Sequence, residues 1–137
     1  MRSVSAGVPA INQAGCWSGG AVRELLDVIG NGSAQVLTGT ADAISFPGTT
    51  IINSPSANAA TLALPLPGAQ PMGDDGKTVE IFIASAFLHT VTTPTNGINL
   101  TKHLLSWSPA AVGGNIILQA WNGSWLVFGT EKGVTIT

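Results

Sequence analysis

The sequence contains few charged residues. Asp, Glu, Lys and Arg make up 9% of its 137 residues, against roughly a quarter in ordinary soluble domains. Residues 43–73, 81–101 and 103–130 contain none of them. A domain of this size that stands alone in water needs a polar surface. With so few charged residues, much of the surface must consist of Thr, Ser, Asn, Gly or exposed apolar side chains. This composition predicts a surface that is buried in an assembly.

Cysteine, clustered basic residues and long apolar runs are also scarce. Cys16 is the single cysteine, so no disulfide within the chain can hold the fold. The five basic residues are scattered and the net charge is -2, which gives no footprint for nucleic acid or an anionic membrane. No run approaches the roughly 18 apolar residues of a membrane-spanning helix. We therefore expect neither nucleic acid nor a membrane as a partner.

Motifs of catalysis, nucleotide binding and structural zinc are missing. The sequence has no nucleophile elbow, phosphate loop, His-Glu-x-x-His motif or cysteine pair. His89 and His103 each lie in an apparent strand, where a hydrogen-bonded strand histidine is far commoner than a base or a ligand. Asp74-Asp75-Gly76 favours a turn, because calcium takes about six to eight oxygens from alternating positions. We expect no enzyme, no cofactor and no metal site.

The first 33 residues differ in texture from the rest. Residues 1–20 are small, aperiodic and rich in Gly and Ser, which predicts an extended arm that only a partner can order. We expect this arm to make the main contact with that partner; the competing view is that it joins the subunits of an oligomer. Cys16 and Trp17, near its end, are most simply a small buried apolar pair at the start of the helix that follows, and we also count them among the interface candidates. One short helix is predicted next, because apolar residues recur at i, i+3, i+4 and i+7 before Gly30. These residues are Val22, Leu25, Leu26 and Ile29.

Residues 34–137 have the pattern of an all-β domain. Short runs rich in Thr, Val and Ile alternate with turn residues about every ten positions, which is typical of an antiparallel β-sandwich or barrel. Almost no helix is expected beyond Gly30. The predicted strands are Ala34–Thr38, Ala43–Phe46, Thr49–Asn53, Thr61–Leu64, Lys77–Ser85, His89–Thr93, Lys102–Trp107, Asn115–Trp121, Ser124–Phe128 and Val134–Thr137.

Asn122-Gly123 gives the clearest local prediction, a type I′ hairpin turn, because both central residues of that turn need positive φ. The two-residue turn places Ala120 opposite Trp125 and Leu118 opposite Val127. With Ile116, these residues form a wholly apolar face that we predict to be core. The other face is too apolar for water and needs a cover, and its residues are Ile117, Gln119, Trp121, Ser124, Leu126 and Phe128.

Phe82 does not fit the alternation of its predicted strand. Val79, Ile81 and Ile83 would occupy one face, and Phe82 would lie among polar residues on the other. Two interpretations stay open: an incidental exposed aromatic, or an interface anchor, because aromatic residues are enriched in buried interface cores. The full set of interface candidates is Phe82, Trp121, Leu126, Phe128, Cys16 and Trp17.

Several segments resemble one family of viral proteins. Residues 41–43 and 46–52 (ADA and FPGTTII), 74–79 (DDGKTV), 89–94 (HTVTTP) and 118–125 (LQAWNGSW) are similar to the capsid decoration, cement or head-fibre proteins of tailed bacteriophages. The resemblance covers about residues 38–137 and rests on turns and strand patterns.

This resemblance implies a β-sandwich or jelly-roll-like domain, commonly a homotrimer, on the outer surface of the virion head. Its partners would be copies of itself and the major capsid protein, whose contacts it would stabilise. The alternative is a receptor- or glycan-binding module of a phage fibre or particle surface that uses Trp107, Trp121 or Trp125 as a stacking platform.

Overall fold

The computed structural model describes residues 11–12, 16–17 and 34–137. In the N-terminal part, β1 (Ile11–Asn12) pairs antiparallel with β2 (Cys16–Trp17). The predicted helix and the rest of the predicted arm lie outside the described residues. Residues 34–137 form a unit of their own, and the account below concerns that unit.

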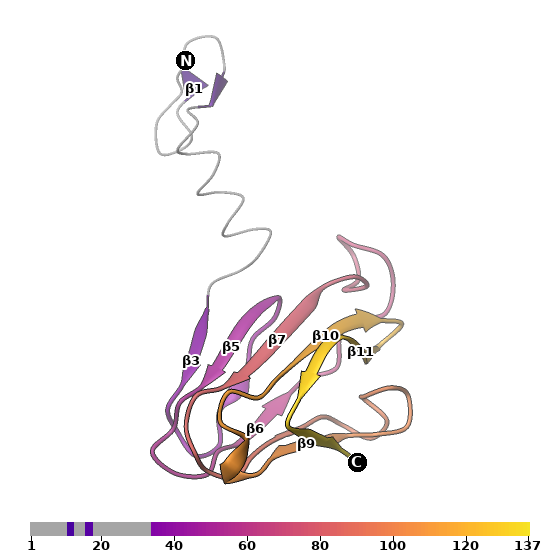
Figure 1. The fold of residues 1–137 in the computed structure, drawn as a ribbon. Coiled ribbons are helices and arrows are strands. Elements are labelled where there is room, and N and C mark those ends of the chain that lie inside the picture. The colour runs from indigo at the N-terminus through magenta and orange to yellow at the C-terminus, as the bar shows by residue number, and fades with distance from the viewer. Residues whose placement is uncertain (1–10, 13–15, 18–33) are drawn as a thin grey trace. The chain divides into compact units, whose positions relative to one another are not determined.

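Residues 34–137 are all-β, with two five-stranded sheets (Figure 1). All ten predicted strands are present, and the one helical element of this unit is the 3-10 turn Pro109–Ala111. The strand order in sheet I is β11-β10-β7-β5-β3, and in sheet II it is β12-β9-β8-β6-β4. The strands are β3 (Gln35–Leu37), β4 (Ala43–Ile44), β5 (Gly48–Ile52), β6 (Ala59–Leu62), β7 (Thr78–Ile83), β8 (His89–Thr92), β9 (Leu104–Trp107), β10 (Asn115–Trp121), β11 (Ser124–Lys132) and β12 (Val134–Ile136).

Both sheets are mixed, so the prediction of an antiparallel, jelly-roll-like domain is wrong. From β3 to β8 the chain alternates between the sheets, and each of the strands β3 to β6 pairs in parallel with the strand two places later. Antiparallel pairing begins with β9 and β10, which add to β8 and β7. The error has a physical cause. The residue composition of a strand indicates which of its faces is buried, but not whether the strand runs parallel or antiparallel to its neighbour. That direction depends on whether the connection turns back within one sheet or crosses to the other sheet.

One hydrophobic core joins the two sheets, as in a β-sandwich. Sheet I contributes the inward residues of β7 and β10, and sheet II contributes those of β6, β8 and β9. Trp107 and Trp125 are the largest fully buried side chains. The remaining members of the core cluster are Leu37, Ile44, Ile52, Ala60, Leu62, Val79, Ile81, Ile83, Val91, Ile98, Leu105, Ile116, Leu118 and Ala120.

The β10–β11 hairpin confirms the predicted register. Asn122 and Gly123 have φ values of 49° and 82°, and Ala120 lies opposite Trp125. Ser124 was expected on the open face but is buried. The loop before Asn99 explains this, because it hydrogen-bonds to the edge of β11: the Trp125 N–H donates to the Gly97 carbonyl at 2.7 Å. This contact also protects part of an edge strand that would otherwise be open to other chains.

Candidate functional site

The outward side of sheet I is the candidate site, and we call it the apolar face. Strand alternation and register place on it large hydrophobic residues from every strand of the sheet. These are Val36, Ile51, Phe82, Ile117, Trp121, Leu126 and Phe128. Its polar members are Thr49, Thr78, Glu80, Asn115, Gln119 and Lys132.

Several of these hydrophobic side chains are open to solvent. Phe128 is 59% exposed, Val36 54%, Trp121 50% and Phe82 39%. One exposed hydrophobic residue is ordinary on a protein surface, but a row that crosses a whole sheet marks an interaction surface. The structure thus brings together four sequence-predicted interface candidates: Phe82, Trp121, Leu126 and Phe128. The other two, Cys16 and Trp17, belong to β2, outside this unit.

The outward side of sheet II provides an internal comparison. It carries mainly small or hydroxylated residues: Ala43, Ala59, Thr61, Thr90, Thr92, Leu104, Ser106 and Thr135. Thr and Ser hydroxyls hydrogen-bond to water, and Ala exposes little apolar area. Both outer faces come from the same chain with few charged residues, but only one of them is rich in large hydrophobic side chains. The low charge of the chain as a whole therefore does not explain the apolar face. One side of the sandwich suits water and the other suits a partner.

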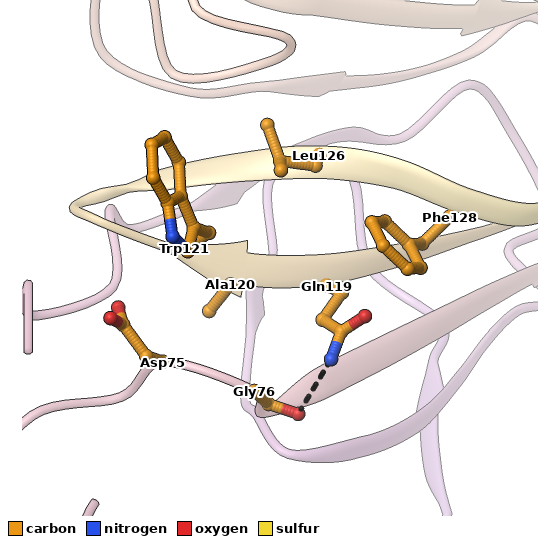
Figure 2. A pocket seen from close by; sticks show the side chains of 7 residues that line it. All are labelled: Asp75, Gly76, Gln119, Ala120, Trp121, Leu126 and Phe128. Carbon is orange, nitrogen blue, oxygen red and sulfur yellow. Dashed lines mark hydrogen bonds between the residues drawn. The ribbon is translucent and has the colours of Figure 1, made fainter. Parts of the chain in front are cut away.

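A hollow of about 510 Å³ opens on the apolar face at the tip of the hairpin. Figure 2 shows the rings of Trp121 and Phe128 on either side of it, with Gln119 between them. The Gln119 amide nitrogen lies 3.5 Å from the Gly76 carbonyl oxygen. Asp75 lies at the rim, and its Oδ1 accepts a hydrogen bond from the Asn122 N–H at 2.8 Å. The hollow therefore offers two aromatic walls and a few polar atoms, a combination that suits an apolar side chain or a flat ring.

Two of the three tryptophans proposed as stacking platforms are excluded from that role. Trp107 and Trp125 are both 0% exposed. Trp125 donates from Nε1 to the Ala63 carbonyl at 2.9 Å and meets the Phe46 ring edge-on, with centroids 4.8 Å apart. Both are core residues, which leaves Trp121 as the one of the three that can contact a ligand.

His89 is fully buried and hydrogen-bonded on both sides of its ring. Nδ1 accepts from the Asn58 N–H at 3.1 Å, so the proton lies on Nε2, which faces the Ser85 hydroxyl at 3.0 Å. A general base would need a free lone pair at Nε2 to take the serine proton. Burial lowers the pKa of His89, and a hydrogen bond with the Ser85 carbonyl partly opposes this shift. His89 therefore holds the core together as a neutral ring. His103, by contrast, is exposed.

Asp74 organises the long loop before β7. Its carboxylate pairs with Lys77 at 2.8 Å and accepts a hydrogen bond from the Leu66 N–H at 2.8 Å. The hydrogen bond from Lys77, followed by that from Leu66, holds the pKa of Asp74 below its ordinary value. Gly76 has a φ of +90°, as a turn requires. The predicted turn at Asp74-Asp75-Gly76 is confirmed.

Metal-ligating clusters and long apolar helices are absent from the described residues. These residues contain no group of three or more His, Cys, Asp or Glu side chains placed to hold a metal ion. In the same part of the chain, no helix has the length and apolar character that a membrane crossing requires.

No protein-family model matches the chain. The search of curated proteins also finds no match.

Proposed function

We propose that this chain is a structural virion protein that decorates the outside of a tailed-bacteriophage head and stabilises contacts between major capsid proteins. The observation that carries the proposal is the contrast between the apolar face of sheet I and the hydroxylated outer face of sheet II. A protein that sits on a particle needs one adhesive side and one side that faces water. The resemblance of residues 38–137 to decoration proteins supplies the identity of the particle.

The size of the apolar face limits what it can do alone. Five strands at about 4.8 Å spacing and about 17 Å of strand length give a face on the order of 400 Å². A standard protein interface buries about 800 Å² on each partner. The face can therefore form the centre of an interface but not all of it. Further contacts must come from elsewhere, such as the N-terminal arm or the neighbouring subunits of a homotrimer.

A decoration protein of this kind stabilises a shell through linkage. Whatever binds the assembled capsid but not its separate subunits favours the assembled state by an amount that grows with saturation. Burial of exposed aromatic residues supplies the driving force, at about 25 cal/mol for each Å² of apolar surface removed from water. Opening a seam between capsomers would then also expose the apolar face.

The test is co-sedimentation of the purified chain with capsids that lack it. We expect saturable binding of the wild type. Phe128→Asp places a charge on the apolar face and should weaken binding at least tenfold. Thr92→Asp places the same charge on the outer face of sheet II and should leave binding unchanged. Wild-type protein that stays in the supernatant at every concentration would contradict the proposal.

Glycan binding remains the second candidate, because Trp121 is half-exposed and lies near Asp75 and Gln119 in the hollow. A sugar ring can stack its apolar face on an indole while its hydroxyls bond to an amide and a carboxylate. Saturable quenching of tryptophan fluorescence by free sugars, lost in Trp121→Phe, would support this function. The measurement is made in a Trp17→Phe background, because Trp107 and Trp125 are buried and Trp17 is the fourth tryptophan of the chain. Quenching that persists when Trp121→Phe is added would argue against binding in the hollow.

A further inference from the structure

Glu80 lies at the centre of the apolar face. It belongs to β7, the middle strand of sheet I, and lies between Thr49 on β5 and Ile117 on β10. Its side chain is half-buried, and in residues 34–137 the ion pair that the structure contains is the one between Asp74 and Lys77. Among the strand residues of the face there is one other charged residue, Lys132, at the corner near the end of β11, and Asp75 lies at the rim of the hollow.

A central carboxylate restricts what can cover this face. An apolar cover would remove water from Glu80, and a buried carboxylate without a partner is strongly unfavourable. A partner surface that supplies a positive charge compensates for this loss, because the carboxylate exchanges its bound water for a charge-assisted hydrogen bond. A single partner surface must therefore satisfy both features of the face. It must be apolar where it contacts the exposed aromatic residues, and it must carry a cation near its middle for Glu80.

A second copy of this chain in a two-fold contact fits that description poorly. A two-fold contact centred on sheet I would place Glu80 against Glu80 of the other copy, and like charges repel in a desolvated contact. A two-fold axis shifted towards β10 and β11 would bring Glu80 near Lys132 of the other copy. That arrangement leaves Val36 and Ile51, at the opposite side of the sheet, uncovered.

We propose that the apolar face binds a different protein surface, in which apolar side chains surround a single Arg or Lys that pairs with Glu80. Around the cation, Phe82, Phe128 and Trp121 contact the apolar part of the partner. This inference deepens the proposed function and rests on it for the identity of the partner, which would be the capsid surface. The chemistry of recognition depends on the apolar face alone.

The first experiment tests that chemistry without capsids. Acetyl-Phe-Arg-amide and the uncharged acetyl-Phe-Gln-amide are titrated at millimolar concentration into the full chain, and backbone amide shifts are followed by NMR. The Arg probe should shift the amides of Glu80, Thr49 and Ile117 and bind about tenfold more tightly than the Gln probe. Glu80→Gln should abolish the difference. Equal binding of the two probes, or shifts confined to other parts of the chain, would overturn the inference.

The second experiment repeats the capsid binding assay with charge variants. We expect Glu80→Gln to weaken binding about tenfold and Glu80→Lys about a hundredfold or more. Glu131→Gln, on edge strand β11, is the matched control and should bind as the wild type does. Added salt should weaken wild-type binding more than that of Glu80→Gln.

The outcomes separate the two proposals. Absence of wild-type binding contradicts the proposed function but not the inference, which the dipeptide probes decide. Wild-type binding that Glu80→Gln leaves unchanged contradicts the inference alone. The remaining possibility is that the face binds a second copy of the chain, and light scattering tests it. If Glu80→Gln and Lys132→Gln each dissociate an oligomer of the free chain, the face binds a second copy and the inference is wrong.

Discussion

The two buried tryptophans give a direct test of the hydrogen bonding in the core. Trp107 and Trp125 are equally buried, at 0% exposure, but their indole N–H groups differ. Trp125 donates to the Ala63 carbonyl at 2.9 Å, whereas Nε1 of Trp107 is buried and has no hydrogen-bond partner among the described residues. Replacing each residue by Phe removes a similar volume and one N–H group, so the difference between the variants isolates the hydrogen bond.

The expected magnitudes follow from these contacts. The lost ring area costs both variants about 1 kcal/mol, at about 25 cal/mol for each Å². Trp125→Phe also loses a hydrogen bond with a net value of about 1 kcal/mol. Trp107→Phe removes a buried unsatisfied donor, a relief of about 1 kcal/mol or more. Trp125→Phe should therefore reduce the free energy of unfolding by about 2 kcal/mol more than Trp107→Phe.

Urea unfolding followed by circular dichroism measures both variants at one fixed protein concentration. Their m-values should match that of the wild type, so that the midpoints report stability alone. Trp107→Ala and Trp125→Ala serve as controls and should each cost about 3 to 5 kcal/mol, as other large aromatic truncations do. A cost for Trp107→Phe equal to or above that for Trp125→Phe would refute the argument, because the hydrogen bond at Ala63 would then contribute nothing.

Three further predictions concern the core, pH and assembly. Gln119→Ala should cost much less unfolding free energy than Trp125→Ala in urea, since it lies on the apolar face rather than in the core. Because the pKa of His89 is lowered in the folded state, the unfolded chain binds more protons than the folded chain below about pH 6.5. The free energy of unfolding should therefore decrease as the pH is lowered from about 6.5, by up to about 1.4 kcal/mol for each pH unit, until the pKa of the folded state is reached. His89→Asn should flatten this slope in thermal unfolding. Light scattering should show an oligomer, and the resemblance to decoration proteins makes a trimer the expected size. A stable species of 13.9 kDa at micromolar concentration would contradict this.

Local features of the fold were predictable from the sequence because their causes are local. The Asn122-Gly123 turn fixes the hairpin register through backbone conformation alone. Once that register is known, alternation assigns Trp125 to the core and Trp121 to the surface, as observed. The positions of the strands follow in the same way from β-branched residues and turn residues.

Pairing between distant strands was not predictable. Val36 and Ile51 belong to the apolar face because β3, β5 and β7 lie side by side in parallel, and nothing in their local sequence shows that neighbourhood. The central position of Glu80 depends on the same fact. Read as part of an isolated strand, Glu80 is an ordinary polar residue on a solvent face, next to the misfit Phe82.

The parallel winding changes the interpretation of Phe82. In a hairpin-based sandwich its neighbours would have been set by adjacent turns, and an exposed aromatic at that position would have been incidental. In the observed sheet Phe82 lies beside Ile51 on β5, which in turn lies beside Val36 on β3. These residues extend the apolar face from the hairpin tip to the opposite edge. An isolated exposed ring needs no partner, but a row of this length remains costly in water unless something covers it. The alternation of the chain between its two sheets therefore assembles, from segments far apart in sequence, the surface on which the proposed function depends.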